Sequence, residues 1–289
     1  MIDQQAQLRA KAEELLRRGA VEMILGFGTG PVGGVRPLFA RQPGDASRLV
    51  WGNRCLPNLA TYLTKEPCRG IMRKGGRVGV IAKGCDARSI LVLIQEAQLE
   101  RQAVHVIGMV CRGMTTDTGE VLAKCGSCRW LLPPVYDNLI GETEDISPIP
   151  GDPLKAAKDL EGASAAERWR FWTGHLSRCI RCYACRQACP LCCCEECLTE
   201  RSRPQWIEKA ATLRGNLAYH FIRAMHLAGR CVACDECTRA CPMEIPVSLL
   251  SAFLSAKVEE EFGYTSGVDV EQKPFMATFG NDDPEGHIR

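Results

Sequence analysis

The chain has 289 residues, of which 24% are charged and 46% are apolar, and its formal net charge is +2. This length leaves room for two domains, and the composition is that of an ordinary globular protein. A net charge near zero with no dense basic stripe argues against binding to nucleic acid, and no apolar run is long enough for a transmembrane segment. The first 18 residues are charged and lack the apolar core of a signal peptide, so we expect a cytoplasmic protein.

The sequence contains 18 cysteines. In a small secreted domain such a number would indicate disulfides, but this chain has no export signal, and eight of its cysteines form a repeated motif described below. We therefore expect reduced thiols in a reducing, anaerobic cytoplasm.

Residues 3–18 contain no glycine or proline and stop at Gly19, which predicts a surface helix capped by that glycine. A short strand at residues 21–25 then leads into a glycine-rich segment. Backbone amides in such a segment can approach a phosphate closely, so Gly26, Gly28 and Gly30 are candidate cofactor contacts. The spacing is not G-x-G-x-x-G before a helix, and a flexible turn is an equal alternative.

A strand at residues 77–82, a helix at 86–99 capped by Asp86 and a strand at 104–110 predict a βαβ unit. Such a unit holds its two strands parallel with a right-handed crossover. Cys85 and Cys111 each follow the carboxyl end of one strand, which is the edge where open α/β sheets bind ligands. We expect these two cysteines to be near neighbours.

A C-x-x-C pair, Cys125 and Cys128, follows in a predicted loop. Together with Cys85 and Cys111 it can supply four thiolates at the sheet edge, which predicts a 4Fe-4S cluster, with structural zinc as the alternative. Three cations, Lys83, Arg88 and Arg112, belong to the same edge. They are candidates for contact with an anionic cofactor, or they are solvated surface cations.

At this point residues 50–142 resemble a known family, the β subunits of the deazaflavin-coenzyme-reducing hydrogenases and their formate dehydrogenase relatives. The resemblance is carried by Gly84-Cys85, Ile107-Gly108, Cys111-Arg112-Gly113, Cys125-x-x-Cys128, Asp137 and Ile140-Gly141. It implies an α/β flavoprotein that holds FAD beside a 4Fe-4S cluster and moves electrons between a two-electron carrier and an iron-sulfur chain.

Two copies of C-x2-C-x2-C-x3-C-P follow, at residues 179–190 and 231–242. Three closely spaced thiolates of each copy hold one cube, and the fourth, followed by proline, reaches the cube of the other copy. The predicted ligands are Cys179, Cys182, Cys185 and Cys241 for one 4Fe-4S cluster, and Cys231, Cys234, Cys237 and Cys189 for the other. Zinc is the alternative, although its structural sites prefer two separated pairs of ligands.

Four further cysteines, Cys192, Cys193, Cys194 and Cys197, come directly after the first copy. Successive side chains diverge, so these four do not hold one cube alone. Three of them, Cys192, Cys194 and Cys197, either join Cys55 or Cys68 around an extra metal centre, replace ferredoxin-type ligands, or pack as thiols against the clusters.

Apolar periodicity predicts three helices around these motifs, at residues 165–177, at 206–228 and from Pro246 onward. The first carries Trp169, Trp172 and Leu176 on one face, where they either form core or cover a cluster. His220 and His226 lie on the second helix and are assigned no role. This arrangement resembles the α-helical ferredoxin domain of succinate dehydrogenase and heterodisulfide reductase subunits.

Four segments follow from these predictions. We expect a three-layer, mainly parallel α/β flavin and iron-sulfur domain at 1–145, a Pro-, Gly- and acid-rich linker at 146–166, a mostly α-helical two-cluster ferredoxin domain at 167–262 and a C-terminal arm at 263–289. The arm either lies along a partner subunit or is a disordered terminus. We expect an electron-transfer subunit of a multi-subunit oxidoreductase, with a flavin-free adaptor as the alternative.

Overall fold

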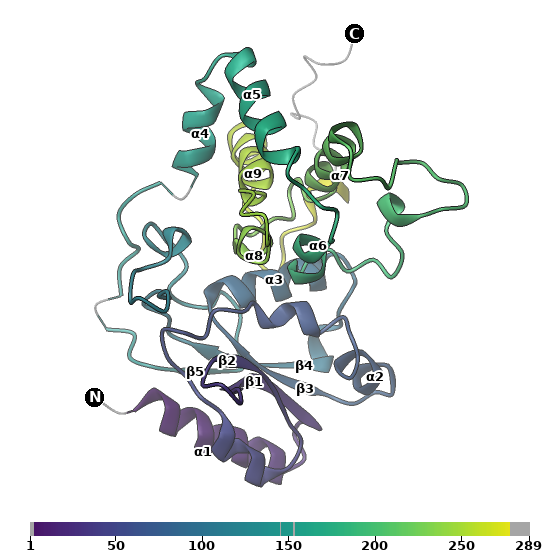
Figure 1. The fold of residues 1–289 in the computed structure, drawn as a ribbon. Helices are drawn as coiled ribbons and strands as arrows, with labels where there is room; N and C mark the ends of the chain where they lie inside the picture. The colour runs from purple at the N-terminus through teal and green to yellow at the C-terminus, as the bar shows by residue number, and fades with distance from the viewer. Residues whose placement is uncertain (1–2, 145, 153, 278–289) are drawn as a thin grey trace. The chain divides into compact units, whose positions relative to one another are not determined.

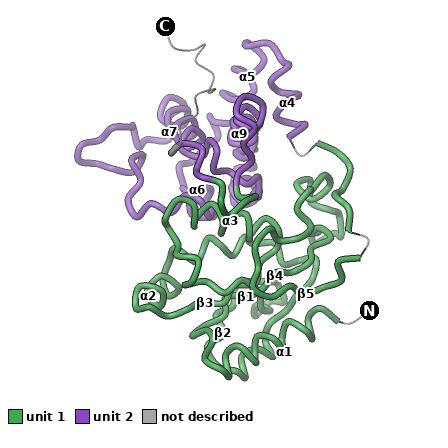
Figure 2. The backbone as a smooth tube through the Cα atoms, turned by 180° about the vertical axis from the view of Figure 1, so that it is seen from behind, with its two compact units in different colours: residues 1–153, 267–272 green, residues 154–266, 273–289 purple. Residues whose placement is uncertain are grey.

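The computed structural model in Figure 1 describes residues 3–144, 146–152 and 154–277. The chain divides into two compact units, which Figure 2 shows in different colours: unit 1 comprises residues 1–153 and 267–272, and unit 2 comprises residues 154–266 and 273–289. Residues 278–289 of the predicted C-terminal arm lie outside the described residues, whereas residues 267–272 of that arm belong to unit 1. Within the described part of the chain, no helix has the length and apolarity needed to span a membrane.

Unit 1 is built on a five-stranded sheet with the strand order β2-β1-β3-β4-β5. The strands are β1 (Met23–Thr29), β2 (Val35–Ala40), β3 (Val78–Ala82), β4 (Val104–Met109) and β5 (Asn138–Ile140). β2 forms an antiparallel hairpin with β1, and the other neighbouring pairs are parallel. Every residue of β3 and β4 is buried, as expected for strands covered on both faces. The predicted mainly parallel α/β sheet is confirmed, while β2 and β5 were not predicted.

The helices of unit 1 are α1 (Gln4–Arg17), α2 (Cys68–Arg73) and α3 (Gly84–Gln95). Figure 1 shows α1 and α3 on opposite faces of the sheet. The carboxylate of Asp3 caps α1 by accepting a hydrogen bond from the Gln5 amide at 2.9 Å. Asp86 is not the N-cap of α3, because the helix begins at Gly84. Its carboxylate instead lies in the first turn and accepts hydrogen bonds from the amides of Lys83 and Leu59.

Unit 2 consists of helices joined by loops, and its described residues include no strand. The helices are α4 (Lys155–Glu161), α5 (Ala165–Leu176), α6 (Ala184–Ala188), α7 (Leu213–His226), α8 (Glu236–Arg239) and α9 (Ser248–Phe262). Helix α4 lies in the segment predicted as a linker. Helix α7 begins later than predicted, because the Thr212 hydroxyl caps it by accepting the Gly215 amide at 3.1 Å.

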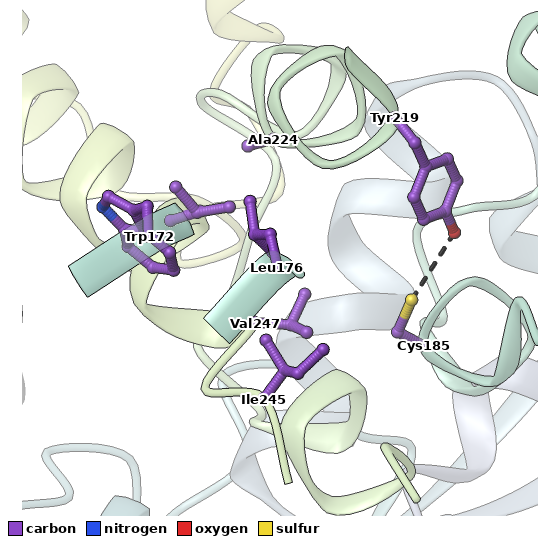
Figure 3. Close-up of a cluster of buried hydrophobic side chains, with 8 residues drawn as sticks. Trp172, Leu176, Cys185, Tyr219, Ala224, Ile245 and Val247 are labelled. Atoms are coloured by element: carbon purple, nitrogen blue, oxygen red, sulfur yellow. Dashed lines mark hydrogen bonds between the residues drawn. The ribbon is translucent and has the colours of Figure 1, made fainter. Parts of the chain in front are cut away.

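A buried cluster of side chains from α5, α6, α7, α9 and the segment before α9 forms the core of unit 2 (Figure 3). Trp172 and Leu176 are 9% and 0% exposed, as expected. Trp169 is 56% exposed, so the prediction that it shares their buried face was wrong for this residue. Tyr219 points toward Cys185 in this core, so cysteines of the first motif are packed directly against it.

Short 3-10 helices occupy several of the connections. Their bounds are Pro43–Arg48, Leu59–Tyr62, Arg101–Ala103, Ala123–Cys125, Leu198–Glu200 and Phe275–Ala277.

Candidate metal centres and cofactor residues

The structure brings the four strand-end cysteines of unit 1 together. Cys85 lies in the first turn of α3 directly after β3, Cys111 follows β4, and Cys125 and Cys128 come from the loop beyond it. Burial raises the pKa of the Cys111 thiol to about 11, and the neighbouring sulfurs of Cys125 and Cys128 raise it as well. Burial also raises the pKa of Cys85, with a contribution from Cys111. The four sulfurs therefore lie close enough to act on one another electrostatically.

Backbone amides point at three of these sulfurs. The amide of Met114 donates to Cys125 Sγ at 3.4 Å, and the amide of Trp130 donates to Cys128 Sγ at 3.4 Å. A backbone amide also bonds the sulfur of Cys111. Amide hydrogen bonds to cysteine sulfur stabilise thiolates and tune the potential of iron-sulfur clusters. The loop therefore directs backbone amides at the sulfurs of Cys111, Cys125 and Cys128.

Glycine 84 allows this loop to approach α3. A Cβ atom at Gly84 would overlap the main-chain carbonyl of Trp130, the residue whose amide bonds Cys128. This close approach explains why glycine precedes Cys85, since any side chain would push the Cys128 loop away.

Lys83 and Arg88 are not open to a ligand at the sheet edge. The Lys83 side chain is 1% exposed, and its Nζ lies 2.9 Å from both an Asp86 carboxylate oxygen and the Pro57 carbonyl oxygen. Arg88 is 6% exposed, and its guanidinium lies over the Trp130 ring at 4.6 Å. The alternative that these residues are solvated surface cations was therefore wrong, because both side chains are buried. The Lys83 ammonium is paired within the interior. Burial raises the pKa of the Cys128 thiol, and the charge of Arg88 lowers it.

The glycines of the glycine-rich segment serve the sheet. Gly26 and Gly28 lie within β1, opposite Leu38 and Arg36 of β2. A Cβ atom at Gly26 would collide with side chains of β3 and of the segment beyond β2. Gly30 closes the hairpin with a hydrogen bond from its amide to the Gly34 carbonyl at 2.7 Å. Residues 26–29 therefore continue the strand where a loop was expected.

Arg112 is exposed and lines a cavity of about 410 Å³ beside the strand-end cysteines. The lining includes Trp51, Asn53, Cys111 and Gly113 as well as Arg112. This volume falls in the range of ligand pockets. The cavity combines an aromatic ring, an amide side chain and a guanidinium next to Cys111, and the carboxylates of Asp3 and Glu142 also line it.

In unit 2, one cavity gathers cysteines from both motifs. Its lining includes Cys179, Cys182 and Cys185 from the first motif and Cys241 from the second. Burial raises the pKa of Cys179, with contributions from Cys185 and Cys182. Cys241 of the second motif therefore lines the same cavity as the three closely spaced cysteines of the first motif.

The second quartet shows the reciprocal arrangement. Burial raises the pKa of the Cys237 thiol, and the sulfurs of Cys189 and Cys231 raise it further. Cys189 is the proline-followed cysteine of the first motif, and Cys234 is buried in the same segment as Cys231 and Cys237. Cys189 therefore lies with the second copy, as Cys241 lies with the first.

The two motifs share the same backbone conformation. Arg181 and Tyr183 of the first motif have φ of 56° and 58°, and Ala233 and Asp235, at the corresponding positions of the second, have φ of 54° and 58°. Left-handed residues that are not glycine are strained and persist where the surroundings require them. Alternating backbone of this kind turns successive amides inward and forms an anion-binding nest. The sequence alone gave no signal for this repeated conformation.

Two side chains of α7 contact sulfurs of the first quartet. His220 Nε2 lies 3.3 Å from Cys179 Sγ, and the Tyr219 hydroxyl lies 3.5 Å from Cys185 Sγ. Burial, with the nearby charges of Arg223 and Arg181, lowers the pKa of His220 to about 4, so the imidazole is neutral at pH 7 and can donate one hydrogen bond to the sulfur. The sequence gave His220 no role, because an isolated histidine on an amphipathic helix has no ligand-like spacing.

The cysteines beyond the first motif line another cavity. Cys192, Cys194 and Cys197 share it with Arg186 and Arg223. The thiols of Cys192 and Cys189 also form a hydrogen bond with each other. Among the described residues, no group of three or more His, Cys, Asp or Glu side chains is arranged to hold a single metal ion.

Cys55 and Cys68 lie in unit 1, and both are buried. Burial raises their pKa values to about 11 and about 12, so both are neutral thiols. Cys55 Sγ is 3.8 Å from the Val50 carbonyl oxygen. They behave as small core residues of unit 1.

The N-terminal part of the chain is similar to named proteins of methanogens. The β subunit of an F420-dependent formate dehydrogenase from Methanocaldococcus jannaschii is 38% identical over 127 residues, which are 43% of this chain and 33% of that protein. The β subunit of F420-dependent formate dehydrogenase 1 from Methanococcus maripaludis is 32% identical over 126 residues, 43% of this chain and 32% of that protein. The N-terminal part is homologous to these β subunits.

The chain spans about a third of the length of the formate dehydrogenase β subunits that it matches. No protein-family model matches it. The similarity supports the resemblance given above for the N-terminal part. The two cysteine quartets of unit 2 are supported by the residues and geometry of this chain alone.

Proposed function

We propose that the chain is an iron-sulfur, flavin-containing electron-transfer subunit of a multi-subunit oxidoreductase. It passes electrons between a two-electron carrier and a partner catalytic subunit through 4Fe-4S clusters. The observation that carries the proposal is the reciprocal exchange of Cys241 and Cys189 between two motifs with the same backbone conformation. This exchange is how two-cluster ferredoxins bind their cubes.

The donor sets fit iron-sulfur cubes. Burial raises the pKa values of Cys237 and Cys179, so these thiols stay protonated and neutral in the absence of metal. A metal cluster deprotonates its cysteine ligands when it binds. The Cys179 sulfur accepts a hydrogen bond from His220, and this hydrogen bond becomes stronger when Cys179 binds a metal as a thiolate. The ligands we propose are Cys179, Cys182, Cys185 and Cys241 for the first cluster, Cys231, Cys234, Cys237 and Cys189 for the second, and Cys85, Cys111, Cys125 and Cys128 for a third.

The residues of unit 1 would place a flavin beside the third cluster. In the 410 Å³ cavity, Arg112 would bind an anionic group, Trp51 would cover an aromatic ring, and Cys111 would hold the adjacent metal centre. FAD, when bound, supplies the exchange between paired and single electrons. The role of the protein is to hold the ring, exclude water from the thiolates and set the cluster potential through the amides of Met114 and Trp130.

The names of the relatives suggest the class of carrier. Both are β subunits of F420-dependent formate dehydrogenases. We infer that the two-electron carrier of this chain is a deazaflavin coenzyme and that its partners are other subunits of a formate dehydrogenase or hydrogenase complex.

A flavin-free adaptor is the second candidate. It is favoured by the finding that Gly26, Gly28 and Lys83 form no open anion site. In that case the chain joins a dehydrogenase or hydrogenase to a heterodisulfide-reductase-type or quinone-linked partner through clusters alone.

The test measures flavin content and cluster reduction in anaerobically prepared chain. We expect about one FAD per chain and bleaching of the clusters when reduced F420 is added. Arg112→Glu should reduce the flavin content, whereas Arg36→Glu, an exposed arginine of β2, should leave it unchanged. Clusters without flavin in the wild-type chain would select the adaptor, and a chain with neither would refute both candidates.

A further inference from the structure

Arg223 carries a permanent charge in the interior of unit 2. It lies on α7 and is 5% exposed. Its Nη2 donates a hydrogen bond to the Cys185 carbonyl oxygen at 3.1 Å, and its Nε has no hydrogen-bond partner. Among the described residues, no carboxylate forms an ion pair with Arg223, although a buried guanidinium without a counter-charge is strongly unfavourable. The structure must therefore provide an anion of another kind.

The groups that face Arg223 are sulfurs. Burial tends to lower the pKa of this guanidinium, but the sulfurs of Cys192, Cys189, Cys237 and Cys185 together raise it. Cys185 belongs to the first quartet, and Cys189 and Cys237 belong to the second. Arg223 is therefore within electrostatic reach of ligands from both proposed clusters.

The other buried arginines of this region have partners that account for them. Arg186 pairs with Glu200 at 2.7 Å. Arg181 donates to the carbonyl oxygens of Gly215 and Glu208, and its guanidinium lies 4.7 Å from the centre of the Tyr219 ring. Arg223 differs because its charge acts on sulfurs from both motifs, whereas Arg181 acts on Cys179 of the first motif.

We propose that Arg223 is the fixed counter-charge shared by the two clusters of unit 2 and that it raises the reduction potential of both. This inference rests on the proposed function, since it requires the clusters to be present. Each cluster takes up one electron and no proton on reduction, so its complex with four thiolates becomes more negative by one charge. A permanent cation at short range in a low-dielectric interior stabilises that added charge.

A shared cation also has a consequence for electron transfer. Because Arg223 acts on ligands of both quartets, it shifts the two potentials in the same direction. The difference between the two potentials, which sets the driving force for electron transfer between the clusters, is therefore left nearly unchanged. In this role Arg223 acts on the clusters through its charge and is not itself a cluster ligand.

The test is a redox titration of the anaerobically reconstituted chain, followed by electron paramagnetic resonance, with iron content measured for each variant. Arg223→Gln should retain the iron and make both clusters at least tenfold harder to reduce, which is a shift of about 59 mV to lower potential for one electron. Arg223→Lys keeps the charge and should stay close to wild type. Arg214→Gln, on the same helix with a side chain 90% exposed, is the matched control and should change nothing.

Every outcome bears on the proposal. Loss of iron in Arg223→Gln with retention in Arg223→Lys would also support it, because the two variants differ in charge. Full iron content with unchanged potentials in Arg223→Gln would overturn it. Loss of iron in both variants would overturn it too, since the shape of the guanidinium rather than its charge would then be required. A wild-type chain without clusters would refute the proposed function instead.

Discussion

If each motif lends its last cysteine to the cluster of the other motif, the iron content of paired cysteine substitutions should follow a specific pattern. Cys241 lies far from Cys179 in the sequence, yet both line the same cavity of unit 2. If they hold the same cube, then Cys241→Ser removes that cube and leaves the other intact. With four irons in each of three cubes, the chain should fall from about twelve irons to about eight.

Combining substitutions distinguishes the exchanged arrangement from a local one. Adding Cys179→Ser to Cys241→Ser should cause no further loss, because both cysteines serve one cube, and about eight irons should remain. Adding Cys231→Ser instead should remove the second cube and leave about four. Cys193→Ser, next to the cavity-lining cysteines but outside both quartets, is the matched control and should retain the full content.

The assay is iron and acid-labile sulfide per chain after anaerobic reconstitution, with electron paramagnetic resonance of the reduced protein to count the remaining clusters. The reasoning would be refuted by the opposite pattern. If Cys241→Ser with Cys231→Ser kept about eight irons while Cys241→Ser with Cys179→Ser kept about four, each motif would bind its own cube with all four cysteines.

Three other substitutions test separate parts of the structure. Gly84→Ala should push the Trp130 carbonyl and the Cys128 loop away from α3, so the chain should lose about four irons while both clusters of unit 2 keep their resonance signals; retention of about twelve irons would show that the close approach of this loop to α3 is not needed to hold the third cluster. Asp86→Asn leaves the buried Lys83 without its counter-charge and should lower the free energy of unfolding by about 3–5 kcal/mol in urea titration, whereas a loss below about 1 kcal/mol would mean that Lys83 is solvated. His220→Ala removes the hydrogen bond to Cys179 and should lower the midpoint potential of the first cluster by up to about 59 mV without loss of iron, and a rise in that potential would contradict the assigned donor.

The sequence predicted the parts of the fold that depend on local pattern. Strands β3 and β4 are continuous apolar runs, and the helix between them is bounded by glycine and polar residues, so the βαβ unit and the approach of Cys85 to Cys111 followed from chain order. Strand β5 has only three residues and too little pattern to be recognised. Strand β2 was missed because the glycines before it suggested a loop, whereas Gly26 and Gly28 belong to β1 and pack closely there against neighbouring side chains.

The candidate site was predictable to the extent that its ligands have fixed spacing. The cysteine quartets have such spacing, and the structure groups Cys241 with the first motif as expected. Lys83 and Arg88 were candidates for contact with an anionic cofactor or for solvated surface cations, and nothing in the sequence shows that tertiary neighbours bury them. His220 and Arg223 reach the sulfurs through the packing of α7, which is three-dimensional information that no spacing rule contains.

The most direct test of the central claim is the content of iron, sulfide, zinc and flavin per chain in anaerobically prepared protein, together with electron paramagnetic resonance of its reduced form. We predict about twelve irons with matching sulfide, and at least eight from the two motifs of unit 2. Fewer than about six irons in fully reconstituted protein, with zinc in their place and no paramagnetic signal on reduction, would contradict it.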